Sequence, residues 1–209
     1  MVTFSKSNSA ISLGTAKIES DSTARIAVDR ISPLVTAATE IIQNSTGGSS
    51  QLLRSGSTAL FYRELIFSTT EDFLDPTYNA VTWGTTHFNP LAPQSYSYVI
   101  YFFDPGDPTY LNNNAPDANP GEIRLMRNDA TFAANKDQLV PAVPFRRLAG
   151  TNIDDPTGAG ITDFRCRRLL SNAAEVIIDT RSFVKRDNGN TERRLSTFAT
   201  IVQAPAESY

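Results

Sequence analysis

The sequence predicts an α+β fold in which a long N-terminal helix packs on an antiparallel β-sheet. Two observations predict it: apolar residues recur at helical spacing over residues 15–43, and later apolar runs have the composition of strands. A helix with one apolar face can bury that face against a sheet in a two-layer domain. We expect a single domain over residues 1–209, because no linker divides the chain.

The first 43 residues are predicted to form the helical segment. Its apolar residues repeat at three- and four-residue intervals, and the opposite face is polar. Pro33 interrupts this pattern and costs roughly 3 kcal/mol in a helix interior, so we expect a bend there. The predicted core face of the helix consists of Ala24, Val28, Ile31, Val35, Ala38 and Ile42.

A thinner apolar line precedes this core face. Phe4, Ile11 and Ile18 are spaced by seven residues, and the residues between them are mostly small and polar. Such a segment has too little apolar area to dock on the sheet of its own chain. We therefore expect this line to contact neighbouring subunits.

Residues 44–158 are predicted to be an irregular, variable region with short strands. Ten of the twelve prolines lie here, and each removes a backbone donor. Residues 59–67 fit a strand or a short helix. Residues 96–103 have high β-propensity throughout, and residues 122–127 are their predicted hairpin partner.

The C-terminal part, residues 159–209, has the clearest strand pattern. Residues 161–170, 173–185 and 193–203 are three β-like runs separated by short polar segments. The Asp187-Asn188-Gly189-Asn190 sequence is typical of a tight hairpin turn, because Asn and Gly accept positive φ. These runs predict an antiparallel meander.

Composition excludes several function classes. The chain is 40% hydrophobic and 20% charged, with a net charge of -3 that is too small to imply a polyanionic partner. Cys166 is the one cysteine and His87 the one histidine, which removes most metal and nucleophile chemistry. No catalytic constellation is present, so we expect no enzymatic activity.

Arginines gather near the C-terminus, and they allow two interpretations. Acidic residues are interleaved with them, which favours solvated strand faces over a phosphate-binding patch. The arginines are Arg165, Arg167, Arg168, Arg181, Arg186, Arg193 and Arg194.

The loop over residues 104–122 is the one candidate metal site. Asp104, Asp107, Asn112 and Asp117 supply the hard oxygen ligands that calcium takes. The same residue types are common in any long turn, and their spacing does not match an EF-hand. Calcium is therefore one of two interpretations of this loop, and no other cofactor is expected.

Taken in order, the elements resemble the minor pilins and pseudopilins of type IV filament systems, most closely the J-type minor pseudopilin of type II secretion. The resemblance covers nearly the whole chain as a pattern of elements. The segments that carry it are ARIAVDRISPLVTAATEII, YSYVIYFF, GEIRLMRN, GITDFRCRRL, EVIIDTRSF and RRLSTFATIVQAP.

The resemblance implies a structural subunit that acts through filament assembly. It implies other pilin subunits as partners, and an inner-membrane helix preceding Val2 that leaves the head in the periplasm or outside the cell. No nucleic-acid partner is expected. Two alternatives stay open: a binding head of such a filament, adhesive or DNA-contacting, and a secreted β-rich binding module unrelated to pili.

Overall fold

The computed structural model describes residues 2–42, 51–53, 60–75, 95–105, 120–150, 159–185 and 189–204. Helix α1 spans Val2–Thr36, and the short helix α2 spans Phe132–Asn135. The strands are β1 (Glu40–Ile42), β2 (Gln51–Leu53), β3 (Leu60–Tyr62), β4 (Glu64–Thr69), β5 (Tyr96–Phe103), β6 (Glu122–Arg127), β7 (Phe145–Ala149), β8 (Gly160–Leu170), β9 (Ala173–Lys185) and β10 (Thr191–Gln203).

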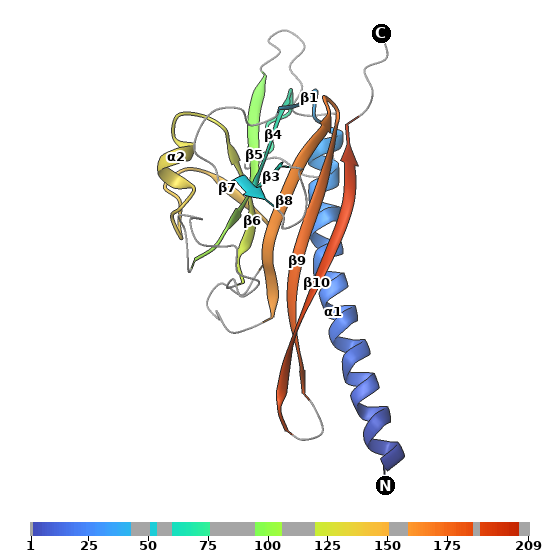
Figure 1. Cartoon of the computed structure of the whole chain (residues 1–209). Helices are drawn as coiled ribbons and strands as arrows, with labels where there is room; N and C mark the ends of the chain where they lie inside the picture. The colour runs from blue at the N-terminus through green and yellow to red at the C-terminus, as the bar shows by residue number, and fades with distance from the viewer. Residues whose placement is uncertain are drawn as a thin grey trace.

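These strands form two antiparallel sheets of five strands each (Figure 1). Sheet A has the order β1-β4-β5-β6-β7, and sheet B has the order β10-β9-β8-β3-β2. Strands β3 and β4 are separated only by Arg63 but belong to different sheets, so the chain crosses from one sheet to the other at this residue.

The predicted fold class is wrong. We expected an α+β protein with a long helix packed on one antiparallel sheet, whereas the described residues are mostly β and form two antiparallel sheets. The prediction failed because β1 to β4 are short and were not recognised as strands that complete two separate sheets, β1 and β4 in sheet A and β2 and β3 in sheet B. The sequence pattern predicted one element over residues 59–67. In the structure this range contains β3, the crossing at Arg63 and the first part of β4.

The first helix also ends earlier than predicted. It stops at Thr36 instead of continuing to residue 43, and residues 40–42 form strand β1, paired with β4. Two of the six predicted core-face residues, Ala38 and Ile42, are therefore not helical. The Thr69 hydroxyl donates to the Ala37 carbonyl at 2.8 Å and satisfies an acceptor that the end of the helix leaves free.

The main hydrophobic core is shared by both sheets and the C-terminal part of α1. Ala24, Ala27, Ile31, Leu34 and Val35 enter it from the helix at three- and four-residue spacing. Both sheets contribute the rest, including Phe67, Tyr98, Ile100, Phe102, Ile123, Leu125, Phe164, Cys166, Val176, Ile178 and Val202. Four of the six predicted core-face residues lie in this part of α1. Ala24, Ile31 and Val35 are buried, and Val28 is half-buried.

Several predicted strands are confirmed. Strand β5 matches residues 96–103 and pairs antiparallel with β6, which matches residues 122–127. Strands β8, β9 and β10 form the expected antiparallel meander. In Figure 1 the β9–β10 hairpin extends toward the same end of the molecule as the N-terminus of α1.

Strand β5 is buried on both faces, which explains its uninterrupted apolar sequence. Tyr98, Ile100 and Phe102 point into the shared core, while Val99, Tyr101 and Phe103 belong to a second cluster with Ile66, Met126 and Phe132. Phe132 comes from α2, so this small helix covers the second face of sheet A. The sequence predicted an irregular region with short strands here and did not predict this helix.

We predict that Ile31→Asp destabilises the fold by roughly 3 to 5 kcal/mol, because Ile31 is fully buried and the new carboxylate would have no partner. Ile26→Asp is the matched control on the same helix, since Ile26 is 47% exposed. Chemical denaturation of both variants measures the difference. Equal, small losses of stability would show that Ile31 does not face the core.

Candidate functional site

The exposed part of α1 is the first candidate for a functional surface. Ile18 is 70% exposed, and among the helix side chains that the structure describes Ala24 is the first that is buried. Phe4 and Ile11, the other members of the predicted contact line, have side chains outside the described residues. In Figure 1 the N-terminal part of α1 extends away from the body of the two sheets, with the long β9–β10 hairpin running beside it. None of the described helices has an apolar stretch of the length that a membrane crossing needs.

The predicted calcium site falls mostly outside the described residues. Asp107, Asn112 and Asp117 all lie there, so the structure does not show whether the four ligands meet. Asp104 is described and is buried just after β5. Within the described ranges no group of three His, Cys, Asp or Glu side chains could hold a metal ion. His87 also lies outside these ranges.

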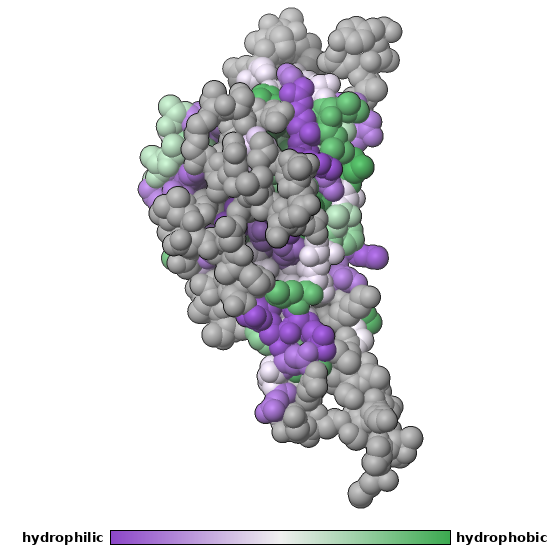
Figure 2. Space-filling model, in the orientation of Figure 1, coloured by the Kyte–Doolittle hydropathy of each residue, from purple (hydrophilic) through white to green (hydrophobic). Residues whose placement is uncertain are grey.

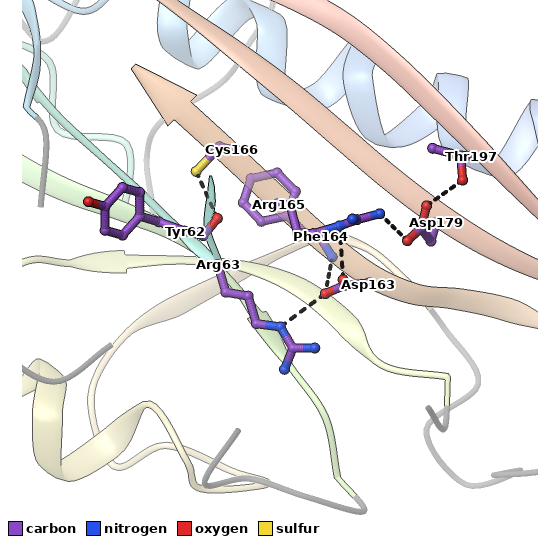
Figure 3. Close-up of polar contacts among 8 residues, drawn as sticks. All are labelled: Tyr62, Arg63, Asp163, Phe164, Arg165, Cys166, Asp179 and Thr197. Carbon is purple, nitrogen blue, oxygen red and sulfur yellow. Dashed lines mark hydrogen bonds and ion pairs between the residues drawn. The ribbon is translucent and has the colours of Figure 1, made fainter. Parts of the chain in front are cut away.

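A buried polar network surrounds the crossing between the sheets (Figure 3). Arg63 Nε lies 3.0 Å from Asp163 Oδ1, and Arg165 Nε lies 3.0 Å from Asp163 Oδ2. Arg165 also pairs with Asp179, whose Oδ1 accepts from the Thr197 hydroxyl at 2.7 Å. The network therefore connects Arg63 to β8, and through β8 to β9 and then β10.

Burial and opposite charge act against each other in this network. Burial raises the pKa of the Asp163 carboxyl, and the positive charges of Arg63 and Arg165 act in the opposite direction. Removing charges from water costs several kcal/mol per ion, which close opposite charges offset. Each carboxylate in the network thus serves to hold a guanidinium in place.

Cys166 contributes to the same crossing. Its thiol lies 3.4 Å from the Tyr62 carbonyl and 3.1 Å from the Glu64 carbonyl, the two residues on either side of Arg63. Burial raises the pKa of this thiol well above its usual range. Because the thiolate is the reactive form, Cys166 is unsuited to act as a nucleophile.

A second buried charge cluster lies on sheet A. Arg124 Nε donates to Glu122 at 2.7 Å, and its other two nitrogens donate to the carbonyls of Gln138 and Leu139. Its guanidinium also lies 3.7 Å from the centre of the Phe103 ring. These bonds fix the segment after α2 against the sheet.

Sequence reasoning missed both buried clusters. Glu122 and Arg124 are two residues apart in a strand and so share a face, which is the one signal the sequence offers for their pairing. Arg63 is followed by Glu64 inside an otherwise apolar run, where the two suggest only charges on an exposed face. Its burial results from the crossing, which the sequence pattern does not reveal.

The C-terminal arginines are largely engaged by carboxylates. Arg165 pairs with Asp163 and Asp179 as described above. The other ion pairs here are Arg167 with Glu175, Arg168 with Glu40, and Arg194 with Glu192. Hydrophilic and hydrophobic residues are interspersed over the described surface in Figure 2. This arrangement agrees with the interpretation of these arginines as partners of acidic side chains; Arg186 lies outside the described residues.

No protein-family model, curated protein or solved structure matches this chain.

We predict that Asp163→Asn destabilises the protein by about 3 kcal/mol, because it removes the carboxylate that contacts buried Arg63. The double variant Arg63→Met, Asp163→Asn should recover part of that loss, since the buried charge is removed as well. Urea unfolding of the single and double variants measures the coupling.

Glu192→Gln is the control for this cycle. Its pair with Arg194 is partly exposed, so the variant should lose no more than about 1 kcal/mol. The assigned role would be contradicted if Asp163→Asn lost as little stability as Glu192→Gln. It would also be contradicted if the double variant lost more stability than the two single variants together.

Proposed function

We propose that this chain is a structural minor subunit, a minor pilin or pseudopilin, of a type IV pilus or type II secretion filament, and that it acts through assembly. The observation that carries the proposal is the division of α1. Its C-terminal part is buried by the two sheets, whereas Ile18, nearer the N-terminus of the helix, is exposed.

An exposed helical surface of this kind favours a partner. A helix with few tertiary contacts is marginally stable in water, so the part of α1 around exposed Ile18 gains stability when another helix packs on it. Full burial of one isoleucine side chain contributes roughly 1.5 to 3 kcal/mol. Ile18 is 70% exposed and could therefore supply a substantial part of such a contact.

The sequence supports the same proposal. The order of its elements resembles the minor pilins and pseudopilins, in which an N-terminal helix joins a β-rich head to the filament. On this proposal the partners are other pilin subunits, and an apolar membrane helix preceding Val2 anchors the protein in the inner membrane with the head in the periplasm or outside. After the correction of the fold class, this proposal rests on the exposed surface of α1 at Ile18 and on the resemblance.

The proposal also accounts for the chemistry of the described residues. Arg63, Arg124 and Arg165 each contact a carboxylate, and the one cysteine is buried with a raised pKa. These groups stabilise the β-rich head, and assembly requires no reacting group. The chain is therefore proposed to act without catalysis.

We predict that Ile18→Asp in the full-length protein lowers incorporation into filaments by about tenfold or more, because it replaces buried apolar area with a charge at the contact. Leu139→Asp is the matched control. Leu139 is 54% exposed but lies between α2 and β7, far along the chain from α1. Both variants should keep the wild-type melting temperature.

Quantitative immunoblotting of sheared filaments measures incorporation for each variant. Normal incorporation of Ile18→Asp would contradict the proposed contact. Equal losses for Ile18→Asp and Leu139→Asp would show that the effect is not specific to the helix.

A further inference from the structure

A pocket of about 190 Å³ lies beside α2, where strand β6 ends. It is formed by residues from three separate segments of the chain, which the packing of sheet A brings together. The lining residues are Leu74, Met126, Arg127, Asp129, Thr131, Val143 and Pro144.

The floor of this pocket is apolar. Leu74, Met126, Val143 and Pro144 provide aliphatic and thioether surface. The volume is several times the roughly 30 Å³ that one water molecule occupies in the liquid. The pocket can therefore hold the side chain of one apolar residue, and filling it would remove further apolar surface from water.

Arg127 lines the pocket and is held in place by its neighbours. Its Nη2 lies 2.6 Å from Asp72 Oδ2, and its guanidinium stacks 4.7 Å from the centre of the Tyr96 ring. Tyr98 Oη donates to the other oxygen of Asp72 at 2.7 Å and fixes that carboxylate. Among the described residues, Nε and Nη1 of Arg127 have no hydrogen-bond partner, so they are free to donate to a ligand.

Asp129 also lines the pocket and brings a negative charge to it. Its Oδ1 accepts from the backbone N–H of Thr131 at 2.8 Å and from the Thr131 hydroxyl at 2.5 Å. These hydrogen bonds lower the pKa of the Asp129 carboxyl, so it is ionised near neutral pH. The carboxylate is only slightly buried, so it can also accept a hydrogen bond from a ligand.

We propose that this pocket binds one apolar side chain of an extended peptide segment from a partner protein. The peptide carbonyl accepts from Arg127, and the peptide N–H donates to Asp129. A neutral amide group complements both charges of the pocket. A free carboxylate would be repelled by Asp129 and Asp72, and an ammonium group by Arg127. This inference is independent of the filament proposal.

Met126 gives a direct measurement of binding. The sequence contains only two methionines, Met1 and Met126, so methyl labelling of methionine places one reporter in the pocket. The probe is N-acetyl-L-leucine methylamide, which carries an apolar side chain between two amides. We expect a saturable shift of the Met126 methyl signal at millimolar probe, and about tenfold weaker binding of N-acetylglycine methylamide.

Charge preference is tested with two further probes. Isovalerate and isoamylamine carry a similar branched chain on an anion and on a cation, and both should bind more weakly than the leucine diamide. In Asp129→Asn the affinity for isovalerate should rise, because the repelling carboxylate is gone while an oxygen that can accept from Thr131 remains.

Val143→Trp should abolish the shift by filling the pocket, and exposed Val140→Trp, three residues away, should keep it. The inference is overturned if the leucine diamide gives no saturable shift in the wild-type protein. It is equally overturned if the glycine diamide or isovalerate binds as well as the leucine diamide.

Discussion

The structure depends on one buried contact, the pairing of Arg63 with Asp163 at the crossing between the two sheets. Arg63 is almost fully buried, and a guanidinium in such a place is tolerated only with close opposite charge. The Cys166 thiol contacts the carbonyls of Tyr62 and Glu64, the residues directly before and after Arg63. A backbone bridge between Gly121 and Ile161 joins the sheets a second time. A side chain at Gly121 would clash with the Phe103 carbonyl, which explains why glycine occupies this position.

Because the crossing fixes the two sheets relative to one another, it also defines the core that receives α1. The buried residues of the helix, from Ala24 to Val35, contact apolar side chains of both sheets rather than of one. The helix is thus secured at its C-terminal part, and the buried residues of α1 that the structure describes begin only at Ala24. This division separates the part of the chain that folds the head from the part proposed to join other subunits. The pocket beside α2 lies on sheet A and would serve a different partner.

The sequence predicted those elements whose pattern is decided locally. Strands β5, β6, β8, β9 and β10 combine high β-propensity with turn residues at their ends, and they appear where expected. The end of α1 was misplaced because Ala38, Ile41 and Ile42 continue the helical spacing, although pairing with β4 draws residues 40–42 into a strand. Tertiary contacts override local spacing here.

The candidate sites were less predictable for the same reason. Burial of Arg63, Glu122 and Arg124 follows from contacts between segments that are distant in the chain. The composition of the chain does not reveal these contacts. The pocket likewise combines Leu74, Met126 and Val143, which are far apart in sequence. The exposure of Ile18, by contrast, agrees with the sparse apolar pattern of the first helical turns.

The most direct test of this account is amide hydrogen exchange along α1 in the isolated chain. If only the C-terminal part of the helix belongs to the folded head, amides of residues 27–36 should exchange slowly, with protection close to that of β5 and β9. Amides of residues 14–22 should exchange much faster, because local opening there breaks no core contact. Uniformly slow exchange along the whole helix would contradict the division of α1 and, with it, the surface on which the proposed assembly depends.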